Sequence, residues 1–170
     1  IEPLLSGGTG SVSHTEEVPS FLPDRFEPGT PNIPGILGLH AALCDLEQTD
    51  MGKLHQHELE LTQYFINGLM QMDPSESTLR AIGKHNTIER TSVVSVQTLQ
   101  TDMARVAYEM DDTYGIMTRV GLHCAPSAHK TLGTYPEGTI RFSFGPENTH
   151  HEVDLALHAL AEITGSPYHL

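Results

Sequence analysis

The chain has 170 residues, with nine Lys and Arg against 22 Asp and Glu, and a formal net charge of −13 at pH 7. That charge disfavours nucleic acid and anionic membrane surfaces as partners. Two cysteines are too few for a disulfide framework and indicate a reducing, cytoplasmic compartment, and no apolar run approaches the ~20 residues of a membrane span. The length suits one domain with an arm.

Residues 1–34 predict an extended arm that serves as an interface segment. Its prolines exclude a continuous helix, and SGGTGS at 6–11 predicts a flexible loop whose backbone N–H groups could hold a phosphate. That run matches neither the P-loop nor the dinucleotide-binding pattern. Phe21, Leu22 and Phe26 have few ways to be buried within the arm, so we expect it to pack on another subunit or domain.

Residues 35–170 predict an α+β domain that begins with two helices. The first, over 35–46, carries apolar residues on most sides, so we expect Cys44 in a core. Asp50 is expected to cap the second, which runs to about residue 72. His55 and His57 are expected on its solvated side. Its predicted apolar face consists of Leu54, Leu61, Phe65, Leu69 and Met72.

Short strands and helices alternate through the remainder of the chain. Residues 78–82, 91–96, 116–120 and 139–144 predict strands, and residues 102–115 and 126–132 predict helices. Thr149 and Glu152 predict a capping box for a last helix that ends at Gly165, followed by a loose tail. In the last strand apolar residues alternate with Arg141 and Ser143, so these two lie on the outer face.

The densest reactive chemistry surrounds Cys124, in the run RVGLHCAPSAHK at 119–130. A thiol attacks as its thiolate, which nearby positive charge or a helix N-terminus favours. That charge could come from Arg119, His123, His129 and Lys130. From the residues alone, Cys124 is either a nucleophile or a small buried hydrophobe. A zinc site formed with His123 and His129 matches no standard spacing.

Arg141 is the second candidate. An arginine on the polar face of a strand could bind a carboxylate in a two-pronged geometry. The alternative is an ordinary solvated strand face.

Four runs, in this order along the chain, resemble cysteine desulfurases of the class V aminotransferase family, which depend on pyridoxal phosphate. They are GGTGS at 7–11, LPDRFEPGTPNIPGILGLHAAL at 22–43, YGIMTRVGLHCAPSAHKTLGT at 114–134 and TIRFSFGPENTHHEVD at 139–154. The resemblance implies the C-terminal half of such an enzyme. Its fold would be the small α+β domain of a fold-type I enzyme, with a short, mostly antiparallel sheet, helices on one side, and an arm that crosses a homodimer interface.

The resemblance also implies roles for single residues. Cys124 matches the family's persulfide-forming cysteine, and Arg141 matches the arginine that holds the substrate carboxylate. Arg119 matches an arginine of the same pocket, and Thr30 matches the threonine that reaches the cofactor phosphate of the neighbouring subunit. We add His123 as a candidate for proton handling, because an imidazole titrates in the useful range.

The family's cofactor lysine lies upstream of the GGTGS region, and this chain has no matching lysine. Lys130 stands in a superficially similar SAHK run, but its place after Cys124 argues against a role in cofactor attachment. We therefore expect the N-terminal cofactor-binding domain to be absent from this chain. The chain would be a fragment or processed piece, inactive by itself.

The implied reaction takes sulfur from L-cysteine as a persulfide on Cys124 and releases L-alanine. Selenocysteine or cysteine lyase or aminotransferase chemistry within the same family is an alternative, and a non-catalytic interaction fragment is another. The expected partners are L-cysteine or a related amino acid, a second copy of the chain, and a sulfur-acceptor protein.

Overall fold

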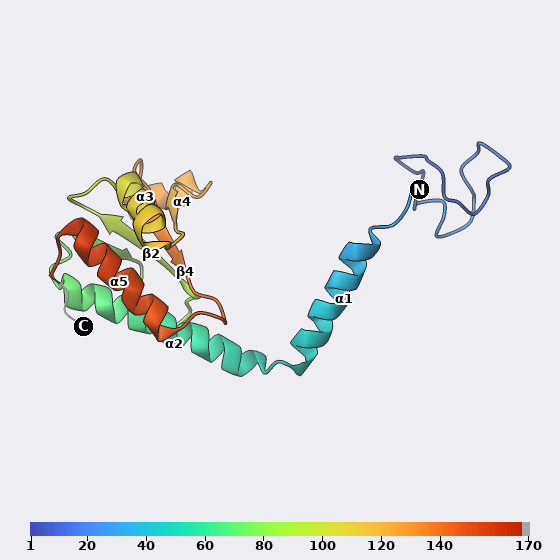
Figure 1. Ribbon diagram of the computed structural model, residues 1–170. Helices are drawn as coiled ribbons and strands as arrows, with labels where there is room; N and C mark the ends of the chain where they lie inside the picture. The colour runs from blue at the N-terminus through green and yellow to red at the C-terminus, as the bar shows by residue number, and fades with distance from the viewer. Residues whose placement is uncertain (168–170) are drawn as a thin grey trace. The chain divides into compact units, whose positions relative to one another are not determined.

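The computed structural model describes residues 1–167, so the end of the predicted tail, 168–170, lies outside the described residues (Figure 1). The chain divides into two compact units, Ile1–Thr49 and a second that begins at Asp50. Within residues 1–167, no helix combines the length and apolar character needed to cross a membrane.

The first unit is an irregular segment followed by one helix. Residues 1–32 contain no helix or strand, and they fold back on themselves, because the Gly29 N–H donates to the Gly8 carbonyl at 2.8 Å. Helix α1 covers Ile33–Gln48 and begins two residues before the predicted start. The cause is Asn32, whose side chain accepts from the Gly35 N–H at 3.1 Å and caps the helix, while a proline is tolerated in the first turn.

The prediction that Cys44 lies in a core is wrong. Helix α1 buries none of its residues, and Cys44 is only partly covered. The apolar side chains around the helix are correspondingly open, with Leu37 61% and Leu39 62% exposed. The first unit contains no second helix or strand that could pack across α1. The apolar residues on most sides of α1 therefore form an exposed apolar surface. Their pattern did not predict that they would be buried within the first unit.

The second unit begins with the long helix α2, Met51–Met72. The Asp50 carboxylate caps it as predicted, accepting from the backbone N–H groups of Gly52 at 3.1 Å and Lys53 at 3.2 Å. The predicted apolar face is buried at Leu61, Phe65, Leu69 and Met72, whereas Leu54 is half-buried. The expectation of a solvated His57 is wrong, because its Nε2 lies 2.9 Å from the carbonyl of Asn148 and the ring is part-buried.

Four antiparallel strands form one sheet in the order β1-β2-β4-β3. The strands cover Leu79–Ile82, Val93–Thr98, Arg119–Gly121 and Thr139–Ser143, and the remaining helices are α3, Met103–Tyr114, α4, Pro126–Leu132, and α5, His150–Thr164. The predicted start of β3 at residue 116 is wrong. Pairing with β4 begins at Arg119, opposite Arg141, and residues 115–117 lie outside the strand, where they line a groove together with residues 142–144.

Helices α2, α3 and α5 cover one face of the sheet, and α2 and α5 lie side by side (Figure 1). The predicted alternation in β4 is confirmed, since Ile140 and Phe142 are buried, as is Phe144 just beyond the strand. The Phe65 ring of α2 lies 4.8 Å from the Phe142 ring and 5.3 Å from the Phe144 ring. The other face of the sheet, here called the outer face, carries Arg141 and Ser143 of β4.

The capping box of α5 is also confirmed. The Thr149 N–H donates to the Glu152 carboxylate at 2.7 Å, and the Glu152 N–H donates to the Thr149 hydroxyl at 3.3 Å. The hydrogen bonds from Thr149, together with one from the Asn148 side chain, lower the pKa of Glu152. The helix ends at Gly165, which takes the left-handed conformation that suits a glycine.

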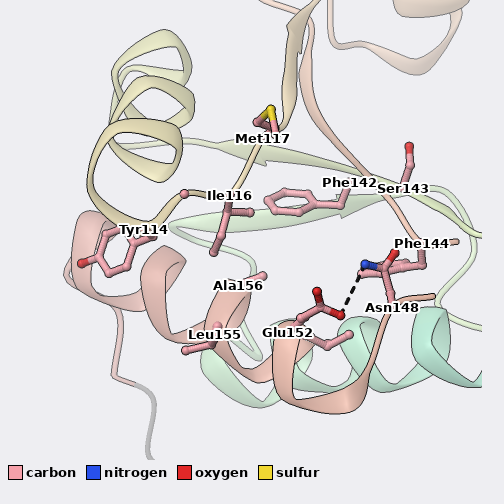
Figure 2. A pocket seen from close by; sticks show the side chains of 12 residues that line it. Tyr114, Ile116, Met117, Phe142, Ser143, Phe144, Asn148, Glu152, Leu155 and Ala156 are labelled. Atoms are coloured by element: carbon pink, nitrogen blue, oxygen red, sulfur yellow. Dashed lines mark hydrogen bonds between the residues drawn. The ribbon is translucent and has the colours of Figure 1, made fainter.

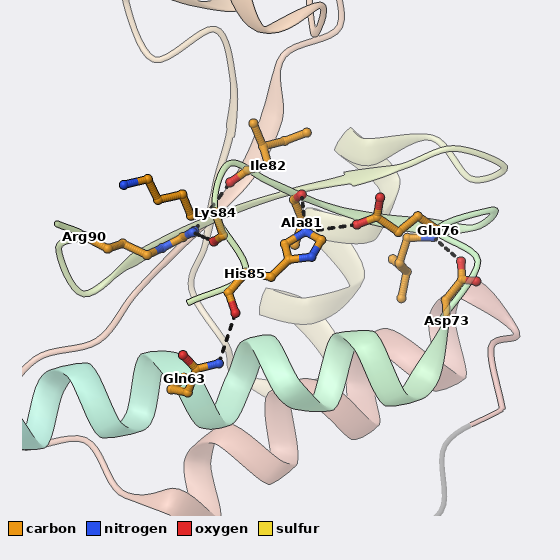
Figure 3. A network of polar contacts seen from close by, with 9 residues as sticks. Gln63, Asp73, Glu76, Ala81, Ile82, Lys84, His85 and Arg90 are labelled. Carbon is orange, nitrogen blue, oxygen red and sulfur yellow. Dashed lines mark hydrogen bonds and ion pairs between the residues drawn. The ribbon is translucent and has the colours of Figure 1, made fainter. Parts of the chain in front are cut away.

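The turn between α2 and β1 is organised around Asp73 (Figure 3). Its carboxylate accepts from the N–H groups of Thr78 at 2.6 Å and Leu79 at 3.0 Å, and from the hydroxyls of Ser75 and Ser77. Burial raises the pKa of Asp73, but these hydrogen bonds outweigh it and lower the pKa to about 2. The charged carboxylate thereby fixes the start of β1.

A second contact ties the β1–β2 connection to the same turn. Figure 3 shows His85 pointing toward Glu76, with His85 Nε2 3.2 Å from the Glu76 carboxylate. The Gln63 amide of α2 donates to the His85 carbonyl at 3.2 Å. These contacts hold the connection against α2.

Candidate active site

Arg119 and Arg141 lie directly opposite each other in the β3–β4 register. Because Ile140 and Phe142 fill the core face, alternation places both arginines on the outer face. Like charges directly opposite are destabilising in an antiparallel pair, so an anion bound between them is favoured. The Nε of Arg141 is buried without a hydrogen-bond partner. The pair can therefore bind a carboxylate.

Cys124 lies at the tip of a tight turn just after β3. The Ala125 N–H donates to the Leu122 carbonyl at 2.8 Å, and His123 and Cys124 have φ of 50° and 59°. Two successive positive φ values define a type I′ turn, whose central positions normally hold Gly, Asn or Asp. The left-handed conformation costs other residues about 1–2 kcal/mol each. Strain of this kind is typical of functional sites.

The turn presents the Cys124 thiol to solvent. The alternative interpretation of Cys124 as a small buried hydrophobe is therefore wrong. The predicted short helix is confirmed as α4, with Pro126 in its first turn and Ala125 at its N-cap. Cys124 thus directly precedes the N-cap of α4.

His123 connects the turn to the arginine pair. Its Nε2 lies 3.2 Å from the Thr139 hydroxyl at the start of β4, and its Nδ1 is buried without a partner. Burial lowers the pKa of His123, and the positive charges of Arg141, His129 and Arg119 lower it further. The imidazole is consequently neutral at neutral pH and retains a lone pair that can accept a proton.

His129 supports the same loop from α4. Its ring lies 5.8 Å from the His123 ring, and its Nδ1 lies 2.7 Å from the buried hydroxyl of Thr134. Thr134 and Thr139 are the residues that sequence reasoning missed. For Thr139 a signal was present, because it stands two residues before Arg141 in the same strand and so shares its outer face.

Two glycines, Gly121 and Gly138, approach each other closely beside the turn that carries Cys124. A Cβ on Gly138 would lie 2.2 Å from the Gly121 carbonyl oxygen, and Gly138 has a φ of +84°, so a side chain at this position is excluded twice. The Gln97 amide donates to the Gly138 carbonyl at 3.3 Å, and Arg80 donates in turn to the Gln97 side chain. Arg80 and Gln97 thus support Gly138, which closely approaches Gly121 at the end of β3.

Other predicted residues lie elsewhere. Thr30 is exposed in the irregular part of the first unit. The Lys130 ammonium lies 5.1 Å from the Tyr135 ring centroid, where it makes a cation–π contact. Among residues 1–167, no group of three or more His, Cys, Asp or Glu is arranged to hold a metal ion.

A groove of the second unit lies apart from these predicted site residues (Figure 2). It has a volume of about 430 Å³ and lies between residues 114–117, 142–144 and α5. Its polar side chains include Asn148, whose amide donates to the Glu152 carboxylate at 3.5 Å, and Glu152, which belongs to the capping box of α5. The groove contains none of the predicted site residues.

The chain matches a family model. Residues 1–156 match the model described as aminotransferase class-V. The chain therefore belongs to the class V aminotransferase family, as the sequence motifs predict.

The chain is also similar to curated proteins that are named probable cysteine desulfurases. The chain is 33% identical over 164 residues to a probable cysteine desulfurase of Staphylococcus epidermidis, covering 95% of this chain and 38% of that protein. It is 34% identical over 168 residues to a probable cysteine desulfurase of Pyrococcus abyssi, covering 97% of this chain and 40% of that protein. The chain thus spans about two fifths of the length of these relatives.

Solved structures share the fold. The apo cysteine desulfurase of Thermococcus onnurineus matches with a TM-score of 0.75 and 32% identity over 96% of this chain and 39% of that one. The cysteine desulfurase CsdA of Escherichia coli matches with a TM-score of 0.66 and 26% identity over 95% of this chain and 38% of that one. These likenesses confirm the predicted α+β fold with an antiparallel sheet.

Proposed function

We propose that the chain is part of a pyridoxal-phosphate-dependent cysteine desulfurase that takes sulfur from L-cysteine as a persulfide on Cys124 and releases L-alanine. The observation that supports the proposal is the position of Cys124, whose exposed thiol lies on a strained turn next to His123. The positive charges of Arg119 and Arg141 act on the His123 ring and lower its pKa, after the larger effect of burial. The relatives named as cysteine desulfurases support it.

The outer face fits the substrate side of such a cofactor. The buried, unpartnered Nε of Arg141 calls for an anionic acceptor, and the buried, unpartnered Nδ1 of His123 calls for a proton donor. An amino acid offers both kinds of group. Thr30 would hold the cofactor phosphate of the neighbouring subunit. When bound, the cofactor supplies the electron sink for the substrate carbon.

Arg141 and Arg119 bind the substrate carboxylate and so direct its sulfur toward Cys124. The Cys124 thiolate attacks that sulfur, and an S–S bond forms as the substrate C–S bond breaks. The pair of electrons from the C–S bond leaves with carbon, which takes up a proton to become the methyl group of alanine. Sulfur is oxidised from thiol to persulfide, and carbon is reduced, so the step needs no external oxidant.

The same proposal covers the partners and compartment. The first unit exposes Phe21, Leu22, Leu37 and Leu39, which supports a homodimer in which a second copy covers them. The exposed turn at Cys124 leaves its sulfur open to an acceptor protein. Both cysteines are free thiols, in keeping with a reducing cytoplasm.

The test uses the full-length protein with pyridoxal phosphate and L-cysteine, followed by peptide mapping by mass spectrometry. We expect one added sulfur on Cys124 and an equal amount of alanine. Alanine without modified Cys124 would overturn the persulfide step and point to lyase or aminotransferase chemistry.

A further inference from the structure

Gln97 is a buried polar side chain that the proposed reaction does not use. It belongs to β2 and is 6% exposed, although strand alternation places it on the outer face, opposite to Val96. Its side-chain oxygen accepts from the Arg80 guanidinium of β1, and its amide nitrogen donates to the Gly138 carbonyl at 3.3 Å. These two hydrogen bonds, here called the Gln97 bridge, connect β1 to the residue just before β4.

Arg80 fixes the direction in which the Gln97 amide points. A guanidinium only donates, so the oxygen of an amide must face it and the amide nitrogen must face away. In the β1–β2 register Arg80 lies directly opposite Gln97, which makes this contact a cross-strand pair. The nitrogen is then available to the Gly138 carbonyl, so Arg80 orients Gln97 and Gln97 holds Gly138.

At Gly138 the Gln97 bridge reaches the turn that carries Cys124. Gly138 lies against the carbonyl of Gly121, the last residue of β3, so closely that a Cβ has no room between them. The Gly138 carbonyl shares its peptide group with the nitrogen of Thr139. Thr139 pairs with Gly121, and its hydroxyl lies 3.2 Å from His123 Nε2. Holding the Gly138 carbonyl therefore fixes the peptide group from which both contacts to the turn start.

The Cys124 turn needs support from outside because its backbone is strained. His123 and Cys124 both have positive φ, and one hydrogen bond, from the Ala125 N–H to the Leu122 carbonyl, closes the turn. Such conformations persist only where the surrounding structure fixes them. The strain of one left-handed residue and the contribution of one hydrogen bond are of similar size, so loss of the contact at Gly138 is enough to let the turn open.

We propose that Gln97 is a positioning residue for the Cys124 turn: oriented by Arg80, it holds Gly138 and keeps the turn in the conformation from which the Cys124 thiolate reaches the substrate sulfur. The inference deepens the proposed function and rests on it. Gln97 acts through the backbone, at the end of the β3–β4 pair where Gly121 meets Thr139. The Arg119–Arg141 pair lies two residues farther along, so the carboxylate site is expected to stay intact.

The first measurement is hydrogen–deuterium exchange, followed by mass spectrometry, on the full-length protein without L-cysteine. Gln97→Met keeps the length of the side chain but makes neither hydrogen bond. We expect amides in 119–125 to exchange about tenfold faster, because the Ala125 N–H loses its partner when the turn opens, and amides in 61–69 of α2 to exchange as in wild type. Unchanged exchange in 119–125, or equal acceleration in both segments, would overturn the proposal. This readout needs no turnover, so it remains decisive even if the desulfurase reaction is not found.

The second measurement is steady-state kinetics with pyridoxal phosphate and L-cysteine. In Gln97→Met we expect kcat to fall about tenfold, which corresponds to about 1.4 kcal/mol and is the size of one hydrogen bond, while KM stays within about twofold of wild type. Gln100→Met is the matched control, because the exposed Gln100 amide donates to the Ser77 carbonyl at 3.2 Å, and its kcat should not change. A wild-type kcat in Gln97→Met, or a raised KM at wild-type kcat, would contradict the positioning role.

Substitutions of Arg80 test whether it acts through Gln97, and they also serve if Gln97→Met does not fold. Lysine can still donate to the Gln97 oxygen, so Arg80→Lys should keep at least half of kcat, whereas Arg80→Met leaves the amide free to rotate and should lower kcat about fivefold. The double variant Arg80→Met/Gln97→Met should lose no more than Gln97→Met alone, since both changes break the same bridge. Multiplied losses in the double variant would overturn the Gln97 bridge.

The competing role for Arg80 is direct binding of the substrate. Its Nε is buried without a hydrogen-bond partner, as is the Nε of Arg141. If Arg80 binds substrate, Arg80→Met should raise KM for L-cysteine and leave exchange in 119–125 unchanged. That result would overturn the proposal, whereas a lower kcat at constant KM together with faster exchange in 119–125 would support it.

Discussion

The turn at Asp73 and the turn at Cys124 have similar backbone conformations, but they differ in how completely their polar groups are hydrogen-bonded. Both contain a non-glycine residue with positive φ, Glu76 at 49° in one and Cys124 at 59° in the other. At Asp73, the six residues that follow it supply four donors, and the carboxylate oxygens accept all four hydrogen bonds. Around Cys124, His123 Nδ1 and Arg141 Nε are buried and lack partners.

The difference teaches how to tell a structural polar cluster from a functional one. A buried carboxylate whose hydrogen bonds are complete stabilises the fold by itself. A cluster that leaves donors and acceptors unpaired beside a strained turn is complete only with a ligand. The comparison predicts that substitutions at Cys124 reduce persulfide formation with little loss of stability. Substitutions at Asp73 are expected to lower the free energy of unfolding and to leave persulfide formation unchanged.

The largest effect is expected from Cys124→Ala in the full-length protein. Loss of the nucleophile should reduce persulfide formation to background while cofactor binding and thermal stability stay as in wild type, because the side chain is exposed. Cys44→Ala is the matched control and should retain the reaction. Persulfide formation that survives in Cys124→Ala would place the chemistry elsewhere.

Arg141→Lys should come next. Lysine keeps the charge but not the two-pronged geometry, so we expect kcat/KM for L-cysteine to fall by about 10- to 100-fold. Steady-state kinetics would show it. Arg105→Gln, on the exposed side of α3 where Arg105 pairs with Glu109, is the control and should leave kcat/KM unchanged. A wild-type kcat/KM in Arg141→Lys would mean that no carboxylate binds there.

Asp73→Ala tests the prediction that the turn at Asp73 contributes to stability and not to the reaction. Removing a charged acceptor from four donors should lower the free energy of unfolding by about 2 kcal/mol, measured by urea denaturation. Persulfide formation per folded molecule should not change. Glu147→Ala, an exposed carboxylate of the same unit, should leave stability within about 0.5 kcal/mol of wild type. Equal stability of the two variants would contradict the role given to Asp73.

The last prediction concerns the response of the same carboxylate to acid. The pKa of Asp73 is lowered from 3.8 to about 2 in the folded state, so its contribution is complete above pH 3.8 and is lost as pH falls through about 2. At about 1.4 kcal/mol per pKa unit, wild type should lose about 2.5 kcal/mol over this window relative to Asp73→Asn. Urea unfolding at several pH values would show the curves converging. Parallel curves would contradict the lowered pKa.

The elements that sequence predicted best depend on local contacts. Asp50, Asp102 and Thr149 each accept from a backbone N–H within three residues, so the start of each helix is encoded within one turn. The alternation in 139–144 likewise predicts which face Arg141 occupies. Cys124 and its short helix were found in the same way, because Pro126 marks the first turn.

Tertiary structure alone decided which of these residues meet. His57 bonds to Asn148 across 91 positions, and His123 bonds to Thr139 across 16. The register that sets Arg119 opposite Arg141 depends on how two strands pair, and a shift of one residue would send the side chains to opposite faces. Apolar periodicity in 35–46 predicted a helix but not its burial, because burial depends on what packs against it. Sequence thus determined the local elements and the reactive residue types, and packing decided which polar atoms were left unpaired for a ligand.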